Sequence, residues 1–143
     1  MMQTHEKILF GERLKINDRI SIKGKFLYAG KQKFYVKGVT YGTFKPDESN
    51  NQFPQQSIVE KDFFLMSQQV LNSVRTYTIP PKYLLDIAQK YKLKVMVGLP
   101  WEQHITFLDT VKRRKNIIHR VKEGVLACEN HPAILCYHEV SFF

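Results

Sequence analysis

The sequence predicts an α/β fold in which an N-terminal β-hairpin leads into the first four β/α units of an eight-stranded (β/α)8 barrel. The N-terminal strand candidates alternate apolar and polar residues, which is typical of strands with one solvated face, whereas the later candidates are apolar throughout. Amphipathic stretches of helical length separate the later strands, in the order strand, helix, strand, helix, strand, helix, strand. Right-handed crossovers then place consecutive strands side by side and parallel.

Length and composition limit the chain to one globular domain. It has 143 residues, of which 43% are hydrophobic and 24% are charged. This length allows a sizeable core but leaves no room for separate cofactor and substrate domains, which excludes multi-domain enzymes. We assign residues 1–33 to a β-hairpin lead-in and residues 34–143 to a partial barrel. Because a whole barrel needs about 250 residues, we expect a truncated barrel with two open sheet edges.

The charge balance is basic. Lysine and arginine number 22 against 13 aspartate and glutamate residues, which gives a formal charge of +9. This excess favours phosphate backbones, anionic lipids and acidic polymers in general. The positive charges are spread along the chain, and the one tight run, Lys112–Lys115, is typical of the solvated face of a helix. The sequence therefore predicts no specific nucleic-acid partner.

Several features predict a cytoplasmic protein. The first residues, Met1–Lys7, are polar and lack the apolar core of a secretory signal. Cys128 and Cys136 do not have the spacing of a zinc site, and we expect them to be buried thiols. The apolar run Val95–Leu99 is far shorter than the roughly 20 residues that a membrane span needs. We expect no metal, no cofactor and no membrane span.

The first elements of the chain are strands. Alternation from Ile8 to about Lys37 predicts a β-hairpin with Gly30 in its turn. The β-branched and aromatic run Val36–Phe44 is the first barrel strand. The polar segment Lys45–Gln56, which contains two prolines, is predicted to be a long exposed loop.

The first helix is predicted from a capping box. In Ser57–Glu60 the Ser hydroxyl and the Glu carboxylate are placed to satisfy free amides at a helix start. Apolar residues then recur at helical spacing, and Asn72 marks the end of the helix. Ser73–Thr78 follows as the second barrel strand. The residues expected on the buried face of this helix are Val59, Phe63, Met66 and Val70.

Two further helices alternate with two apolar strands. Pro80–Pro81 opens the second helix, since proline is tolerated in a first turn. Leu93–Leu99 is the third strand, Phe107–Glu129 the third helix and Ala133–Tyr137 the fourth strand. The residues predicted to point inward are Leu84, Ile87, Ala88 and Tyr91 in the second helix, and Leu108, Val111, Ile118, Val121 and Val125 in the third.

Three segments carry a family resemblance that covers Phe26–Tyr137. Tyr35–Tyr41 is similar to the first barrel strand, Asn72–Tyr77 to the second, and Asn130–Leu135 to the lead into the fourth strand, of the TIM-barrel glycoside hydrolases in the clan that includes glycoside hydrolase family 2. The resemblance implies a TIM barrel and a carbohydrate partner. It also implies that the parent enzyme hydrolyses or transfers O-glycosidic bonds.

A closer resemblance involves three segments. Gly38–Phe44, Val74–Pro81 and Val97–His104 look like the glycosidase-like module of some large bacterial proteins that also carry a family 2 glycosyltransferase region. This resemblance implies a module that is associated with a glycosyltransferase.

Candidate binding residues lie at the C-terminal ends of the strands, where barrel enzymes place their chemistry. Arg75 ends the second strand, and the resemblance implies that it holds the nucleophilic carboxylate, while a structural ion pair is equally consistent. Tyr41, Tyr77 and Trp101 also lie at strand ends, where flat rings stack on sugar faces. We favour this role for Trp101 and a core position for the two tyrosines.

Two polar residues follow the third strand. Glu102 and His104 are placed to contact sugar hydroxyls, although a lone Glu or His in a loop is more often simply solvated. The predicted substrate-binding residues are therefore Arg75, Tyr77, Trp101, Glu102, His104 and Tyr41.

No catalytic residue is assigned, and the status of the chain as an enzyme stays open. Retaining hydrolysis needs two carboxyl groups about 5 to 5.5 Å apart. The resemblance places the acid in an Asn-Glu pair past the fourth strand, whereas Glu139 comes too early, and it places the nucleophile at a seventh strand that the sequence lacks. We expect a truncated carbohydrate-active module that is inactive alone. The alternative is a non-catalytic half-barrel that dimerises through its open edges and binds a glycan or an acidic polymer.

Overall fold

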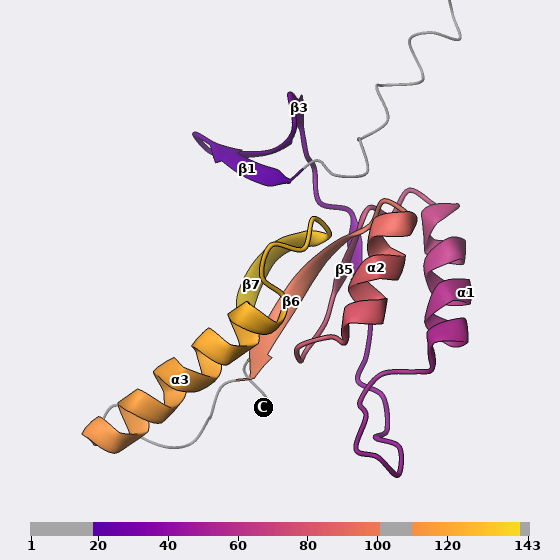
Figure 1. The fold of residues 1–143 in the computed structure, drawn as a ribbon. Helices are drawn as coiled ribbons and strands as arrows, with labels where there is room; N and C mark the ends of the chain where they lie inside the picture. Colours follow the sequence, from indigo (N-terminus) through magenta and orange to yellow (C-terminus); the bar gives the residue numbers. More distant parts are fainter. Residues whose placement is uncertain (1–18, 101–109, 141–143) are drawn as a thin grey trace, which may run out of the picture.

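The computed structural model describes residues 19–100 and 110–140, which form two β-sheets and three helices (Figure 1). The first sheet is antiparallel, with the strand order β1-β2-β3, and the second is parallel, with the strand order β4-β5-β6-β7. The antiparallel strands are β1 (Ile20–Lys23), β2 (Phe26–Ala29) and β3 (Gln32–Lys33). The parallel strands are β4 (Gly38–Thr40), β5 (Ser73–Arg75), β6 (Lys94–Pro100) and β7 (Ile134–Val140), and the helices are α1 (Gln56–Ser67), α2 (Lys82–Lys90) and α3 (Val111–Ala127).

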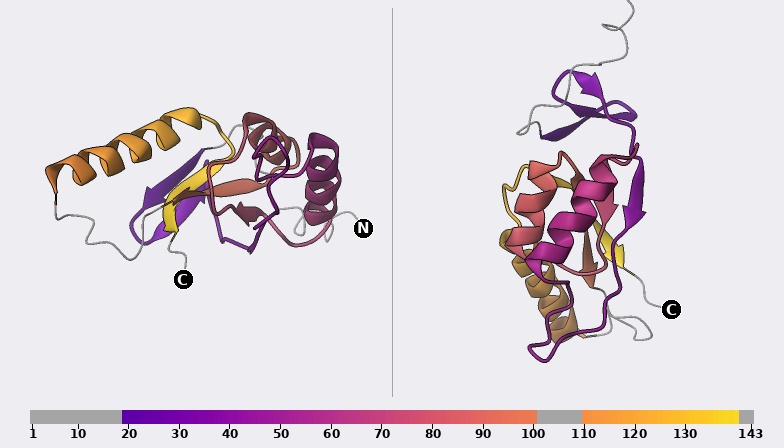
Figure 2. Two further views of the ribbon diagram at one scale, coloured as in Figure 1. Left: turned by 90° about the horizontal axis from the view of Figure 1, so that it is seen from below. Right: turned by 90° about the vertical axis from the view of Figure 1, so that its right-hand side faces the viewer.

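The parallel sheet confirms the predicted partial barrel. Along the chain, one helix follows each of the first three strands of this sheet, and strands that are consecutive in the sequence are neighbours in the sheet. Helices α1 and α2 cover the same face of this sheet (Figure 2). Val74, Val95 and Val97 point to this face and are fully buried, together with Phe63 of α1 and Leu84 of α2. The helix-facing side chains of the strands thus form the main core.

The N-terminal sheet has one strand more than the predicted hairpin. The chain turns at Gly24 as well as at the predicted Gly30, and both glycines have left-handed φ angles, of 61° and 60°. Ala29 and Phe34 of this region pack on Leu135 of β7. The sheet therefore lies against the end of the partial barrel at which β7 begins (Figure 1). The part of the expected hairpin before residue 19 lies outside the described residues.

The start of α1 shows that the predicted capping box is wrong. Its N-cap residue is Gln55 and no side chain caps it, so the Ser57 hydroxyl does not have the expected role. The Glu60 carboxylate instead pairs with Lys90 and accepts a hydrogen bond from the Tyr91 hydroxyl at 2.5 Å. These hydrogen bonds, the one from Lys90 first, hold the pKa of Glu60 below its usual range. The Glu60 carboxylate thus links α1 to the C-terminal end of α2 and does not cap α1.

The end of α1 also differs from the prediction. The helix ends at Ser67, and Val70, which we expected on its buried face, is 73% exposed. Asn72, the predicted stop residue, joins the two strands instead. Its side-chain oxygen accepts a hydrogen bond from the Lys37 amide at 2.8 Å, and its side-chain nitrogen donates to the Tyr35 carbonyl at 2.7 Å. Asn72 therefore fastens the start of β5 to the segment that leads into β4.

Helix α2 follows the prediction and anchors the loop before β7. Pro81 is its N-cap residue, and the expected inward residues Leu84, Ile87 and Ala88 are buried. His131 Nδ1 accepts a hydrogen bond from the Ala133 amide at 3.2 Å, so Nε2 carries a proton and donates to Asp86 at 3.0 Å. Hydrogen bonds from Lys82 and then His131 lower the pKa of Asp86. The Asn-His-Pro segment thus ties β7 to α2.

Helix α3 confirms only part of the predicted buried face of the third helix, since Val121 and Val125 are half-buried. Val111 and Ile118, which we expected inward, are 59% and 52% exposed. The residue of α3 that is buried is Gly124, where a Cβ atom would lie 2.5 Å from Ile79 Cδ1. The helix meets the rest of the structure through its C-terminal half, so the first turns extend beyond the sheet (Figure 1). The predicted inward residue Leu108 lies outside the described residues.

Backbone packing is very close at Gly98 of β6. A Cβ atom there would lie 2.4 Å from the Thr76 carbonyl oxygen and 2.5 Å from the Tyr77 carbonyl carbon. The Gly98 amide donates to Thr76 Oγ1 over 3.4 Å, and the Thr76 amide donates to the Met96 carbonyl at 3.0 Å. These contacts continue the pairing of β5 and β6 past Arg75, the last residue of β5.

We predict that Gly98→Ala lowers the free energy of unfolding by about 1 to 3 kcal/mol, because two backbone segments must separate to admit the methyl group. Gly124→Ala is the matched control. Its Cβ meets the movable end of the Ile79 side chain, and alanine gains about 1 kcal/mol of helix propensity over glycine. Urea unfolding followed by circular dichroism measures both variants. Equal unfolding midpoints for the two variants would contradict the packing that we describe.

Candidate functional site

The inner face of the parallel sheet carries a row of side chains across all four strands. The register aligns Thr40 of β4 with Arg75 of β5, and Arg75 with Met96 of β6. Met96 is aligned in turn with Cys136 of β7. His138 lies two residues further along β7 and therefore on the same face. The C-terminal end of this face thus presents Arg75 and His138 side by side.

This inner face is concave. A hollow of about 310 Å³ runs along it from β4 to β7. It is lined by Val36, Gly38, Val39, Thr40, Ser73, Val74, Arg75, Met96 and Leu135. The wall is apolar apart from short hydroxyls and the Arg75 side chain, so Arg75 brings the positive charge to this hollow.

Arg75 is an exposed residue held from two sides. Its guanidinium carbon lies 5.2 Å from the centroid of the Tyr77 ring, and its Nε lies 3.4 Å from His138 Nε2. The first contact is a cation–π interaction, which positions the planar guanidinium over a flat ring. The structure therefore brings together two of the predicted site residues, Arg75 and Tyr77, with a histidine that we did not predict.

His138 joins β7 to β5 at the C-terminal end of the sheet. Its Nε2 lies 3.1 Å from the Thr76 carbonyl oxygen, and its Nδ1 lies 3.2 Å from the Glu139 carbonyl oxygen. With the proton on Nδ1, the ring donates to the Glu139 carbonyl, and its Nε2 lone pair accepts from the Arg75 Nε–H at 3.4 Å. This contact engages the Nε–H of Arg75 and not the N–H donors at the end of its guanidinium, which are the donors that oxygen atoms of a ligand in the hollow would meet.

Tyr41 occupies a core position, as we favoured from the sequence. It is 6% exposed, and its ring meets Phe44 and Phe63 edge-on, with centroid distances of 4.8 and 5.1 Å. Its hydroxyl donates to the Asp62 carboxylate at 2.7 Å. Burial, and then the hydrogen bond to Asp62, raise the pKa of the Tyr41 phenol far above its usual value.

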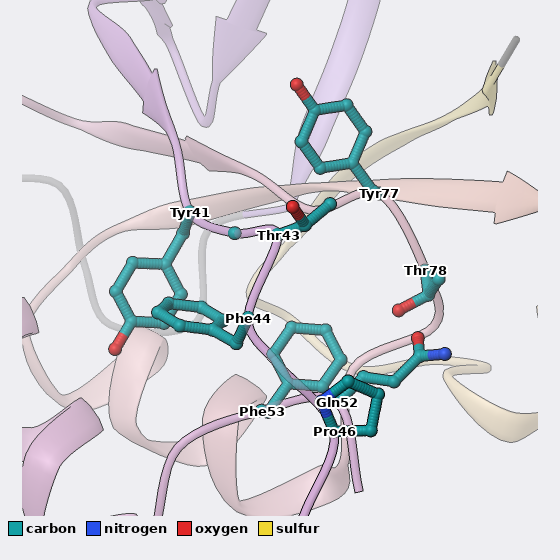
Figure 3. A pocket seen from close by; sticks show the side chains of 9 residues that line it. Tyr41, Thr43, Phe44, Pro46, Gln52, Phe53, Tyr77 and Thr78 are labelled. Carbon is teal, nitrogen blue, oxygen red and sulfur yellow. The ribbon is translucent and has the colours of Figure 1, made fainter. Parts of the chain in front are cut away.

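A second, smaller pocket lies beside Tyr77 in the loop that follows β4. Its volume is about 170 Å³, and Figure 3 shows the rings of Phe44 and Phe53 with Pro46 along its wall. The hydroxyl of Tyr77 is turned away from these rings in the same view. The lining residues are Tyr41, Gly42, Thr43, Phe44, Pro46, Gln52, Phe53, Tyr77 and Thr78.

The remaining predicted site residues are not brought into this geometry. Trp101, Glu102 and His104 lie outside the described residues. Glu139 alternates with His138 along β7, so it lies on the opposite face from Arg75. Among the strand ends that the structure describes, no carboxylate thus faces the hollow.

The described residues contain no group of three or more His, Cys, Asp or Glu side chains that could hold a metal ion. Cys128 is buried and Cys136 is half-buried, and burial raises the pKa of both thiols. Protonated thiols are poor metal ligands. Within residues 19–100 and 110–140, no helix has the length and hydropathy that are needed to cross a bilayer.

Comparison with known proteins decides the family. A sequence model described as "Glycosyl hydrolases family 2, TIM barrel domain" matches residues 20–138, which is most of the chain. The chain belongs to this family. No curated protein matches the chain.

Solved structures agree with the fold of the family 2 TIM-barrel domain. Saccharomyces cerevisiae Gas2p in complex with laminaripentaose is 18% identical, with a TM-score of 0.62 over 85% of this chain and 30% of that chain. An apostructure of a Gas2p mutant is also 18% identical, with a TM-score of 0.62 over 89% and 30%. A complex of ScGas2 with a compound is 19% identical, with a TM-score of 0.61 over 85% and 30%. The chain therefore spans about 30% of the length of these proteins, and the likeness shows a shared fold.

The family assignment indicates where in this fold a ligand site is expected. In TIM barrels the ligand site lies at the C-terminal ends of the parallel strands. Arg75 is the last residue of β5, Tyr77 follows two residues later, and His138 lies two residues before the end of β7 next to Arg75. His138 was not predicted as a site residue, since it follows the predicted fourth strand, Ala133–Tyr137, and belongs to none of the family motifs. Its alternation with Cys136 on a strand next to β6 was the signal that could have found it.

We predict that Tyr41→Phe leaves the alkaline absorbance titration of the protein unchanged between about pH 9 and 11, where ordinary tyrosines with a pKa near 10 ionise. The phenol of Tyr41 stays protonated in this range because its pKa is raised. The loss of one ionising phenol from this range in Tyr41→Phe would show that Tyr41 is not held as described.

Proposed function

We propose that this chain is part of a carbohydrate-active module of glycoside-hydrolase type, and that the concave inner face at Arg75 binds a glycan. The complete module would hydrolyse or transfer O-glycosidic bonds. The family assignment supports the reaction class. The observation that carries the binding site is the cluster of Arg75, Tyr77 and His138 at the C-terminal ends of the strands.

The cluster has the chemistry of a sugar site. A guanidinium presents several N–H donors in one plane, and neighbouring sugar hydroxyls can accept two of them at once. The cation–π contact with Tyr77 and the position of His138 restrict the rotation of the Arg75 side chain. This restriction reduces the entropy that the side chain loses when a ligand binds.

Binding without hydrolysis is the expected behaviour of these strands by themselves. Hydrolysis of a glycosidic bond needs two carboxyl groups on opposite sides of that bond. In the described part of the chain, Glu139 is the carboxylate at the strand ends, and it lies on the face away from Arg75. The catalytic pair would have to come from residues beyond this cluster. Association with a glycosyltransferase region remains part of this proposal, on the resemblance of Gly38–Phe44, Val74–Pro81 and Val97–His104.

A second candidate is a non-catalytic half-barrel that pairs with another copy. Among the described strands, β4 has β5 as its only neighbour and β7 has β6, so both outer edges of the sheet are open. Val36 and Val39, beside the β4 edge, are 47% and 38% exposed. Parallel pairing of β4 with the β7 of a second copy would cover both edges and enclose the hollow.

The direct test of the proposed site is titration with laminaripentaose, the glycan in one Gas2p complex, by isothermal calorimetry. Arg75→Gln should raise the dissociation constant at least about tenfold, since a hydrogen bond from a charged donor contributes about 1.5 to 3 kcal/mol. Tyr77→Ala should weaken binding as well. Arg114→Gln removes the same charge from an exposed position on α3 and should leave the dissociation constant unchanged.

Two outcomes would contradict the proposed site. The first is an Arg75→Gln variant that keeps its circular dichroism spectrum and binds the glycan like the unsubstituted protein. The second is equal weakening by Arg75→Gln and Arg114→Gln, which would indicate attraction to the overall charge. Light scattering during the titration reports the oligomeric state and so separates the two candidate functions.

A further inference from the structure

The outer side of α3 carries a continuous stripe of alternating aliphatic and lysine side chains. Its members are spaced by four, three, four and four residues, which places them along one side of a helix with 3.6 residues per turn. All of them are exposed, and the three aliphatic side chains are 59%, 52% and 62% exposed in chain order. We call this surface the α3 stripe; it consists of Val111, Lys115, Ile118, Lys122 and Leu126.

No described element covers the α3 stripe. Helix α3 lies at the edge of the molecule in Figure 1 and in the left view of Figure 2, with its first turns beyond the sheet. The opposite side of the helix, at Gly124, meets Ile79 and Leu99. The aliphatic side chains of the stripe are therefore not part of the core.

The charge of α3 is strongly one-sided. Its sequence holds six lysine and arginine residues against a single glutamate. That glutamate, Glu123, pairs with His119 at 3.2 Å. The first turn has no acidic residue, and the run Lys112–Lys115 lies there, where the helix dipole disfavours positive charge. This arrangement costs helix stability in water and becomes favourable next to an anionic surface.

We propose that the α3 stripe docks on an anionic lipid surface, with the helix axis parallel to the plane of the membrane. Val111, Ile118 and Leu126 would enter the boundary between headgroups and acyl chains. Lys115 and Lys122 would extend their methylene stems along this boundary and place their ammonium groups at the lipid phosphates. The formal charge of +9 adds long-range attraction to the same surface.

The aliphatic members of the stripe distinguish a membrane from other polyanions. A nucleic acid or an acidic polysaccharide in water can pair its anionic groups with the lysine ammonium groups, but it leaves the three aliphatic side chains exposed. A lipid surface satisfies both, because its phosphates lie directly above an apolar layer. The attachment is peripheral, since α3 is too short and too polar to cross a bilayer.

The test is co-sedimentation of the whole chain with phosphatidylcholine vesicles that either contain or lack phosphatidylserine. We expect binding to the anionic vesicles, weak binding to the neutral ones, and a loss of binding as salt is added. The double variant Lys115→Gln and Lys122→Gln should lower the partition coefficient onto anionic vesicles about 25-fold, which is roughly fivefold for each charge that is removed. Ile118→Ser should lower it about tenfold.

Matched controls come from other surfaces of the same chain. Lys25→Gln with Lys31→Gln removes two exposed lysines from the turns of the N-terminal sheet and should have a much smaller effect. Val70→Ser removes an aliphatic side chain that is 73% exposed and should leave partitioning unchanged. Arg75→Gln should bind vesicles normally, which keeps this test independent of the proposed glycan site. Thermal melts verify that each variant is folded.

Three results would overturn the proposal. One is the absence of binding to phosphatidylserine vesicles. Another is that Ile118→Ser binds the anionic vesicles normally, and that this variant and the unsubstituted protein are retained equally on heparin. That result would indicate a general polyanion interaction. The third is equal effects of the stripe variants and the control variants, which would show that the net charge acts without the α3 stripe.

Discussion

The close approach of β5 and β6 at Gly98 is the constraint on which the rest of the candidate site depends. Because Gly98 has no side chain, the backbone of Thr76 and Tyr77 lies directly against it. This approach buries Thr76 completely, and the Thr76 carbonyl oxygen lies 3.1 Å from His138 Nε2. His138 in turn lies next to Arg75. A glycine in a central strand thus sets the position of the polar cluster, although it contributes no functional group.

The two faces of the parallel sheet have different roles that follow from strand alternation. Side chains such as Val74 and Val95 face α1 and α2 and supply the buried core, whereas Arg75 and Met96 face the concave side. The N-terminal sheet packs on Leu135 near the start of β7. The open, charged end of the hollow is therefore the C-terminal end, which is the end that TIM barrels use for ligands.

Patterns that act over short distances predicted most of the fold. The apolar strands predicted the parallel sheet, and the stripe of Leu84 and Ala88 predicted α2. These predictions hold because the residues that are buried there recur with the period of the element. Tertiary contacts decided the features that the sequence misplaced. Glu60 is taken by Lys90 and Tyr91 and so does not cap its helix. The apolar residues of α3 could not be oriented from the sequence, because a helix with apolar residues on several sides allows more than one buried face.

Native-state amide hydrogen exchange tests the central claim that the parallel sheet is one cooperative unit holding the site. The amides of Thr76 and Val95 bond to Met96 and Ala133 across strands. Both should exchange only through global unfolding, with the same free energy, while the Arg114 amide in the first turn of α3 exchanges through local opening. Exchange of Thr76 or Val95 as fast as that of Arg114 would contradict the account, because the strand ends would then not be held in place.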